Sequence, residues 1–128
     1  MSKILVVDDE ADLEILVKQK FRKKIRENIY EFVFAQNGEE ALERIKENPD
    51  LEVVLSDINM PVMDGLTLLT RLADANPTLK AVVVSAYGDM QNIRSAMNKG
   101  AFDFVCKPVD FDDLDLTIQK TLEKKLPV

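Results

Sequence analysis

Short apolar runs recur along the chain at regular intervals. Five strand-like segments begin 22 to 28 residues apart, near Lys3, Tyr30, Glu52, Lys80 and Phe102. They contain apolar runs rich in β-branched residues or phenylalanine, at residues 4–7, 32–35, 53–55, 81–84 and 102–105. The first, third and fourth runs show no polar alternation, which is typical of parallel strands covered on both faces. This spacing suits a strand, a helix and short loops, so the pattern predicts five βα units.

Between the strands, apolar residues recur with helical periodicity. The first segment is predicted to be one long helix with an apolar face of Leu13, Leu16, Val17, Phe21 and Ile25. The second and third helices are marked by Ala41, Leu42 and Ile45 and by Leu68, Leu69 and Leu72. The fourth is marked by Met90, Ile93, Ala96 and Met97, and the fifth by Phe111, Leu114, Ile118 and Leu122. Asp110 precedes the fifth helix as a natural N-cap, with Asp113 at the third helical position.

These elements predict one α/β domain. Right-handed crossovers between parallel strands give a doubly wound, five-stranded (βα)5 sheet, most simply in the order 2-1-3-4-5. The domain is expected to span residues 1–126, with residues 127–128 as a short tail, because 128 residues suffice for one core and not for two. In this order strands 1 and 3 are neighbours and the winding reverses between them, which is where open α/β sheets build their sites.

Acidic residues follow two of the predicted strands at the point where each strand ends. Asp8 and Asp9 close the first apolar run, and Asp57 closes the third shortly before Pro61, which cannot continue a strand. Since strands 1 and 3 are neighbours, we expect the three carboxylates to meet at one edge of the sheet. They would repel one another unless positive charge joins them.

Positive charge is available at the same edge. Lys107 and Ser85 end the fifth and fourth strands and are expected to flank the crevice. Three aspartates carry −3 and Lys107 carries +1, which leaves −2 for one divalent cation to neutralise. The chain contains no histidine, which excludes Ser-His-Asp and Cys-His catalysis, histidine metal sites and a histidine phosphocarrier. A metal would therefore be bound by oxygen, which favours Mg²⁺.

The overall composition limits the partners and the cellular location that can be expected. A net charge of −6 argues against direct binding to nucleic acid. No apolar run approaches the roughly 20 residues that span a bilayer, so no membrane association is expected. Asp8 and Asp9 also interrupt any secretory leader, and the lone Cys106 permits no internal disulfide. We therefore expect a cytoplasmic protein.

Four short motifs stand at predicted strand ends. They are Val7-Asp8-Asp9-Glu10, the segment Ser56-Asp57-Ile58-Asn59-Met60-Pro61 with Asp64-Gly65, Ser85-Ala86 and Lys107-Pro108. Together they resemble the receiver domain of bacterial two-component response regulators. Each motif is weak alone, but their order makes the resemblance specific, and it runs from about residue 2 to residue 125. It implies a flavodoxin-like fold and a phosphorylated signalling domain that catalyses only its own phosphorylation and slow dephosphorylation, as in the chemotaxis regulators.

The resemblance also implies a role for each site residue. Asp57 would be the phosphoacceptor, because a carboxylate can attack phosphorus when the charge on the phosphoryl oxygens is offset. Mg²⁺, with Mn²⁺ as an alternative, would be bound directly by Asp57 and Asp9, through water by Asp8, and by the backbone carbonyl of Asn59. Lys107 would hold one phosphoryl oxygen. Ser85 would hydrogen-bond another, and the Lys107–Pro108 peptide would be cis.

Signal output is implied in the same way. In the family, phosphorylation draws the hydroxyl of the residue at the Ser85 position inward, and an aromatic residue on strand 5 follows it. Phe104 occupies that position, although it could equally be a core residue. The output surface would be helix 4, strand 5 and helix 5, and it would contact an effector or form a homodimer on phosphorylation. The implied phosphodonor is a histidine kinase or a histidine phosphotransfer protein.

Two further residues are expected to tune the lifetime of the phosphoryl group. Asn59 and Tyr87 lie two residues after Asp57 and Ser85, so their side chains could line the path of the attacking water. We expect Tyr87 to obstruct that path and slow hydrolysis.

Two other functions stay open at this level. A haloacid dehalogenase-like phosphohydrolase also uses an aspartyl phosphate and Mg²⁺, but its Asp-x-Asp motif lies on the first strand, whereas this chain has Asp57-Ile58-Asn59 on the third. Steady phosphomonoester turnover would favour that enzyme, and stoichiometric labelling would favour the receiver. A nucleotide or flavin binder is disfavoured because no glycine-rich phosphate loop is present.

The first helix carries an unusual concentration of positive charge, at Lys18, Lys20, Arg22, Lys23, Lys24 and Arg26. A solvated basic face explains this segment, and a docking surface for an acidic partner is the alternative.

Overall fold

The computed structural model describes residues 1–58, 65–75, 78–86 and 88–123. The strands are β1 (Ser2–Val7), β2 (Tyr30–Ala35), β3 (Leu51–Asp57), β4 (Lys80–Ala86) and β5 (Asp103–Lys107). The helices are α1 (Ala11–Lys20), α2 (Arg22–Arg26), α3 (Gly38–Glu47), α4 (Gly65–Ala75), α5 (Met90–Asn98) and α6 (Phe111–Glu123). Strands and helices alternate as predicted, with one extra helix after α1.

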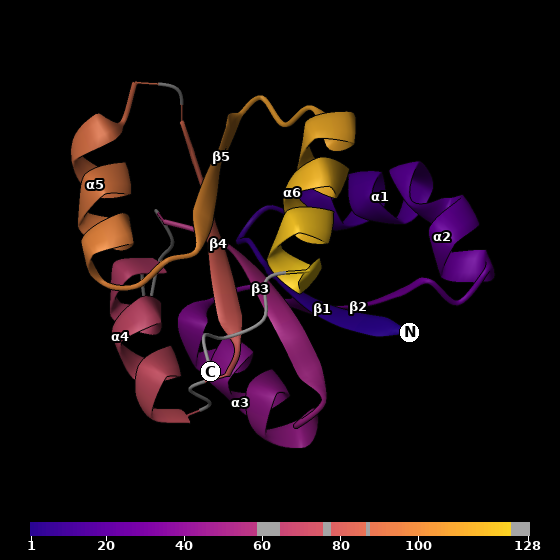
Figure 1. Cartoon of the computed structure of the whole chain (residues 1–128), viewed down its shortest axis with the longest axis horizontal. Helices are drawn as coiled ribbons and strands as arrows, with labels where there is room; N and C mark the ends of the chain where they lie inside the picture. Colours follow the sequence, from indigo (N-terminus) through magenta and orange to yellow (C-terminus); the bar gives the residue numbers. More distant parts are fainter. Residues whose placement is uncertain (59–64, 76–77, 87, 124–128) are drawn as a thin grey trace.

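The strands form one parallel sheet in the order β2-β1-β3-β4-β5, which confirms the predicted topology (Figure 1). Its register aligns the carboxyl ends of the strands. Val7 is paired with Ser56, and Asp57 is paired with Val84. Ala86 is paired with Lys107 on the far side of β4. The segments that follow β1, β3, β4 and β5 therefore leave the sheet at the same edge.

Each face of the sheet is covered by helices. On one face Leu5, Val7, Val54 and Val83 pack with residues of α3, α4 and α5. On the other, the alternate positions Ile4, Val6, Val53, Leu55 and Val82 pack with residues of α1 and α6. Successive strand residues point to opposite faces, so two buried faces require continuous apolar runs. This explains why β1, β3 and β4 show no polar alternation.

The prediction of one long first helix is wrong at Phe21. Phe21 has φ −100° and ψ 15°, and it separates α1 from α2. The amide of Phe21 still donates to Val17 O at 3.0 Å, and the amide of Ile25 donates to Phe21 O at 2.9 Å. The ring of Phe21 is buried against Tyr30 and Phe32, with ring centroids 5.9 and 5.4 Å away. Packing of this ring accompanies the break in the helix.

Three residues predicted to lie on apolar helix faces are exposed. Leu16 is exposed, because Val17 and Phe21 four residues later occupy the core-facing stripe of α1. Met90 and Met97 of α5 are exposed as well, whereas Ile93 and Ala96 are buried. α5 therefore buries a narrower stripe than its sequence predicts.

The N-terminus of α6 is capped as predicted. Asp110 Oδ1 accepts hydrogen bonds from the amides of Asp112 at 2.9 Å and Asp113 at 3.3 Å. An aspartate here satisfies amides that have no partner within the helix and lies favourably at the positive end of the helix dipole.

A polar network joins α2 and β2 to α6. Tyr30 donates its hydroxyl to Asp115 Oδ1 at 2.7 Å, and Lys24 Nζ forms an ion pair with Asp115 Oδ2. Lys18, in the same basic segment, is paired with Glu14 at 3.3 Å. Part of the predicted basic face therefore serves ion pairs within the protein. In the part of the chain that the structure describes, no helix has the length and apolarity required to cross a membrane.

Candidate functional site

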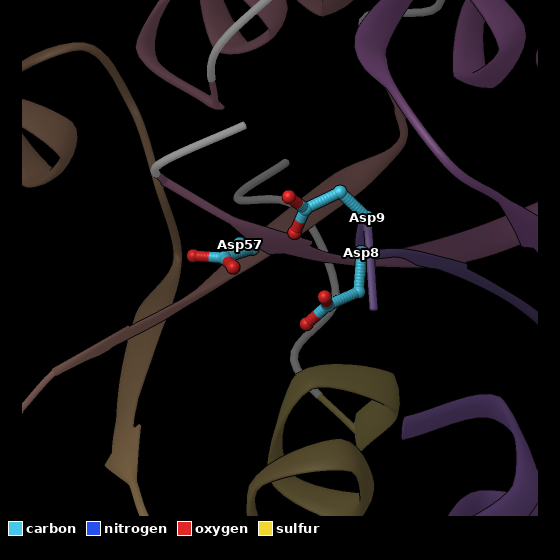
Figure 2. A group of neighbouring side chains, drawn as sticks. All are labelled: Asp8, Asp9 and Asp57. Carbon is cyan, nitrogen blue, oxygen red and sulfur yellow. The ribbon is translucent and has the colours of Figure 1, made fainter. Parts of the chain in front are cut away.

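The three predicted aspartates come together at the carboxyl edge of the sheet. Asp8 and Asp9 follow β1, and Asp57 is the last residue of β3. One carboxylate oxygen of each residue lies within 4.8 Å of those of the other two. Figure 2 shows the three side chains beside one another, with those of Asp8 and Asp9 extending toward Asp57. Asp8 and Asp57 are buried and Asp9 is exposed, so the cluster is open to solvent on the side of Asp9.

Lys107 supplies the positive charge at this cluster. Its Nζ lies 3.0 Å from Asp57 Oδ2 and 3.5 Å from Asp8 Oδ2, so one ammonium contacts both buried carboxylates. Lys107 is the last residue of β5, and the peptide bond to Pro108 is cis, as predicted.

The electrostatics of the cluster follow from burial and charge. Burial raises the pKa of Asp8 above its ordinary value, and this effect outweighs the amide of Glu10, which donates to Asp8 Oδ1 at 2.8 Å, and the charge of Lys107. Burial would lower the pKa of Lys107, but the hydrogen bond to Asp57 and the charges of Asp57 and Asp8 raise it. Lys107 is therefore a stable cation, and the cluster keeps an excess of negative charge.

The donor set suits a hard cation. Three carboxylates offer oxygen atoms close enough to contact a single ion, and the described part of the cluster contains no sulfur or nitrogen ligand. Oxygen ligands of this kind bind Mg²⁺ or Ca²⁺ rather than zinc or copper. An added cation would also offset the excess negative charge of the three carboxylates beside Lys107.

Ser85 lies at the end of β4 and is 1% exposed. Its hydroxyl donates to Asp89 Oδ2 at 3.1 Å, in the turn that leads into α5. Ser85 is thus at the predicted edge of the sheet, but its hydroxyl hydrogen is used by Asp89. Phe104, on β5, is 38% exposed, so it is not a core residue.

Two residues of the predicted site, Asn59 and Tyr87, lie outside the described residues.

Asp89 was not predicted from the sequence as a residue of the site. A signal for it existed, because an aspartate immediately before the periodic segment that starts at Met90 is a typical N-cap. Its contact with Ser85 could not be read from that signal.

Comparison with known proteins identifies the family. Residues 4–119 match the response regulator receiver domain. The chain is 37% identical to chemotaxis protein CheY of Bacillus subtilis over 121 residues, covering 94% of this chain and 97% of that protein. It is 35% identical to sporulation initiation phosphotransferase F of the same organism over 124 residues, covering 96% and 95%. The crystal structure of the receiver domain of NtrX from Brucella abortus superposes with a TM-score of 0.83 at 33% identity, covering 95% of this chain and 99% of that one.

These similarities agree with the flavodoxin-like fold and with the motifs at the strand ends. They give no support to the phosphohydrolase alternative, since the matched family is one of signalling domains rather than of enzymes that turn over a substrate. The chain belongs to the response regulator receiver domains, the phosphoacceptor signalling domains of two-component systems.

Proposed function

We propose that Asp57 accepts the phosphoryl group. The observation that carries this proposal is the surroundings of its carboxylate at the end of β3, where Lys107 Nζ lies 3.0 Å away and oxygens of Asp8 and Asp9 lie within 4.8 Å. A carboxylate held beside a fixed cation can approach a phosphoryl group without prohibitive repulsion. Asp9 lies on the exposed side of the cluster, so a phosphodonor can reach the cluster from solvent on that side.

Transfer of the phosphoryl group from the donor to Asp57 is a displacement at phosphorus. An oxygen of Asp57 forms a bond to phosphorus, the bond from phosphorus to the donor's histidine nitrogen breaks, and that nitrogen retains the electron pair. The product is an acyl phosphate on Asp57. Lys107, which contacts Asp57 and Asp8, turns to a phosphoryl oxygen and offsets its charge.

Asp8, Asp9 and Asp57 would hold Mg²⁺, or Mn²⁺ in its place, with the backbone carbonyl of Asn59 as a further ligand. When bound, the ion neutralises charge on the phosphoryl oxygens. The charges of the cluster support its involvement, because three carboxylates and one ammonium leave −2. Asp9 and Asp57 bind the ion directly in this proposal, and Asp8 acts through water.

The output of the domain would pass from Ser85 to Phe104. Ser85 moves to the phosphoryl group, and the exposed ring of Phe104 takes up the space that this movement opens. Phenylalanine has no hydroxyl, so its two positions differ only in packing. The changed surface comprises α5, β5 and α6, and it contacts an effector or a second copy of the chain.

Replacement of Phe104 tests this output step. Phe104→Ala should accept phosphate as fast as the wild type but weaken the phosphorylation-dependent response of the partner about tenfold, because a large apolar contact is lost. Binding of the phosphorylated chain to its partner, or to itself, is the measurement. Ile29→Ala, also exposed but in the turn before β2 and outside the proposed output surface, is a matched control for loss of apolar surface. Unchanged binding by Phe104→Ala would contradict the switch role.

Tyr87 and Asn59 would set the lifetime of the acyl phosphate. Tyr87→Ala should hydrolyse it several-fold faster, because the side chain no longer obstructs the attacking water. An unchanged rate of dephosphorylation would remove Tyr87 from the proposal.

Response regulators act with histidine kinases and effectors. For this chain we propose a histidine kinase or phosphotransfer protein as the donor, with residues 1–126 as the receiver domain and the cytoplasm as its location.

Intact mass spectrometry tests the function directly. The chain is incubated with Mg²⁺ and acetyl phosphate, and we expect one added phosphoryl group. The label should be absent in Asp57→Asn and in EDTA. Asp50→Asn, an exposed acid-to-amide change remote from the cluster, should be labelled like the wild type. Labelling of Asp57→Asn, or steady turnover of a phosphomonoester by the wild type, would overturn the proposal.

A further inference from the structure

The hydroxyl of Ser85 is already engaged in this structure. It donates to Asp89 Oδ2 at 3.1 Å, and Asn92 Nδ2 donates to the same oxygen at 3.0 Å. Ser85 is almost fully buried and Asp89 is partly buried, so water competes weakly for this contact. A hydroxyl carries a single hydrogen, so Ser85 cannot donate to Asp89 and to a phosphoryl oxygen at the same time.

Asp89 also occupies the N-cap position of α5. Its carbonyl accepts the amide of Ile93 at 3.1 Å, the first hydrogen bond of the helix. An N-cap aspartate normally accepts an amide of the first turn with its carboxylate. Among the described residues, the Asp89 carboxylate accepts no backbone amide of the first turn of α5, and its Oδ2 accepts instead from the side chains of Ser85 and Asn92. Asp110 makes this side-chain bond at the start of α6.

We propose that Asp89 is a positioning residue that holds the Ser85 hydroxyl away from Asp57 in the unphosphorylated protein. A phosphoryl group on Asp57 competes with the Asp89 carboxylate for the one hydroxyl hydrogen. When Ser85 turns to the phosphoryl group, the carboxylate is released to cap the first turn of α5. This inference rests on the proposed roles of Asp57 and Ser85, and it adds the element through which they reach α5.

The exchange gives phosphorylation a route to the output surface. α5 begins one residue after Asp89, and its exposed Met90 and Met97 lie on the proposed output face. Moving the carboxylate from Ser85 to the helix changes the hydrogen bonds of the first turn of α5. The single hydroxyl hydrogen of Ser85 can be donated to Asp89 or to a phosphoryl oxygen but not to both, and these two arrangements form the two-state element that couples the site to a distant surface.

The test measures affinity for beryllium trifluoride, a phosphoryl mimic, in the presence of Mg²⁺. Asp89→Asn keeps the size and capping ability of the side chain but accepts the hydroxyl without a charge. We expect it to bind the mimic about tenfold more tightly, since loss of a charge-assisted hydrogen bond favours release of Ser85. Asp89→Ser, which also caps helices, should act in the same direction.

A double-mutant cycle separates the positioning role from a general charge effect. If Asp89 acts through Ser85, Asp89→Asn should change the affinity little in a Ser85→Ala background. An equal gain in both backgrounds would mean that removal of a nearby negative charge is the whole effect, and it would overturn the inference. Asp110→Asn, a matched change at the N-cap of α6, should leave the affinity unchanged.

Nuclear magnetic resonance provides a second readout. In the wild type, the mimic should shift the amide signals of Gln91 and Asn92 and slow their hydrogen exchange, because the released carboxylate caps them. Absence of that change would overturn the capping step. Failure of the wild type to bind the mimic, or to be labelled at Asp57, would instead count against the proposed function itself.

Discussion

Asp8 is an unfavourable anion in the metal-free protein. Burial raises its pKa above the ordinary value of 3.8 despite hydrogen bonding to Glu10 and the charge of Lys107. The folded state therefore holds a proton on Asp8 more tightly than the unfolded state does. The stabilising effect of that proton is fully present below about pH 3.8, and it is lost as the pH rises through the raised folded pKa.

Replacement of Asp8 by asparagine tests this prediction. In EDTA at pH 7, Asp8→Asn should be more stable than the wild type by about 1 kcal/mol, because a buried charge is removed and the acceptor for Glu10 is kept. The difference should shrink as the pH approaches 4, and urea unfolding across this range is the measurement. Mg²⁺ should stabilise the wild type more than the variant, because the wild type retains three acids for the ion. A variant less stable than the wild type at pH 7 in EDTA would contradict this.

The residue scale also shows the limit of prediction from sequence. Asp8, Asp9, Asp57 and Lys107 could be identified because each ends an apolar run, and the ends of parallel strands share an edge. The direction of the Ser85 hydroxyl could not be predicted from the sequence, because it depends on where the turn before α5 places the carboxylate of Asp89.

At the scale of elements, Asp115 fixes α6 to α2 and β2. Burial alone would raise its pKa, but hydrogen bonds from Lys24 and Tyr30 outweigh that effect and lower it. Burial raises the pKa of Tyr30, and the hydrogen bond to Asp115 raises it further. Since the folded pKa of Asp115 is depressed, its stabilising contribution is present above about pH 3.8 and is lost as the pH falls through the folded pKa.

Asp115→Asn should lower the free energy of unfolding by about 1–2 kcal/mol at pH 7, because two donors lose a charged acceptor. As the pH falls below about 4 and through the depressed folded pKa of Asp115, the variant and the wild type should converge. Asp112→Asn, an exposed change on the same helix, should cost less than about 0.5 kcal/mol. Urea unfolding at pH 7 and pH 3 is the measurement, and a pH-independent difference would contradict the ionic origin of the effect.

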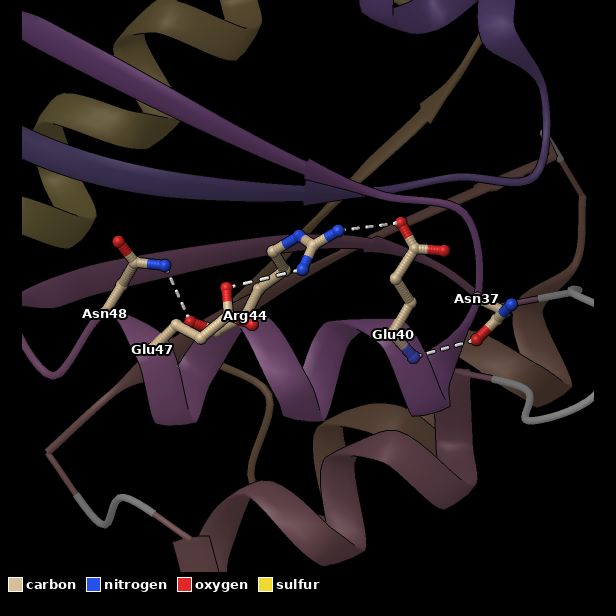
Figure 3. Close-up of polar contacts among 5 residues, drawn as sticks. All are labelled: Asn37, Glu40, Arg44, Glu47 and Asn48. Atoms are coloured by element: carbon tan, nitrogen blue, oxygen red, sulfur yellow. Dashed lines mark hydrogen bonds and ion pairs between the residues drawn. The ribbon is translucent and has the colours of Figure 1, made fainter.

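Helix α3 has polar contacts at both ends (Figure 3). Asn37 Oδ1 accepts the amide of Glu40 at 2.9 Å, and Asn48 Nδ2 donates to Arg44 O at 2.8 Å. Arg44 also lies 3.5 Å from Glu40 and 3.4 Å from Glu47, in ion pairs along the helix surface. Ion pairs between residues three or four apart on a helix surface contribute only a few tenths of a kcal/mol, so the cap contributes more to the stability of α3.

Asn37→Ala should therefore destabilise the protein by about 1 kcal/mol, whereas Asn37→Asp should keep most of the stability, because aspartate also caps helices. Thermal unfolding of the two variants side by side is the measurement. Equal losses in both would show that the Asn37 side chain acts other than as a cap.

Helices and strands were predicted well where a single hydrophobic periodicity dominates the segment. They were predicted less well where tertiary packing decides where an element ends. The five strands and the cap at Asp110 were confirmed. The break at Phe21 was not predicted, because Phe21 falls at an apolar position of the helical pattern, as it would in a continuous helix. Only the packing of its ring against β2 accompanies the break, and the sequence does not show that packing.

For the whole molecule, the shared sheet joins two cores. β1, β3 and β4 contribute alternate residues to each face, so neither core can unfold while the other keeps its strands. Leu68 on one side and Ile118 on the other are both fully buried.

Leu68→Ala and Ile118→Ala should each lower the free energy of unfolding by about 2–5 kcal/mol, and each variant should still unfold in one transition. Far-UV circular dichroism and tyrosine fluorescence during urea unfolding should coincide. Leu116→Ala, which is exposed, should change stability by less than about 0.5 kcal/mol. Separate transitions for the two probes would mean that the faces unfold independently.

The sequence by itself determined the alternation of strands and helices, the strand order and the acids at the strand ends. These properties depend on local periodicity and on the handedness of crossovers, which a single chain displays directly. Tertiary structure alone decided which atoms meet. Lys107 reaches Asp57 across 50 residues of chain, Ser85 donates to Asp89, and Leu16, Met90 and Met97 stay exposed. Each of these depends on the register and packing of segments that are brought together only when the chain is folded.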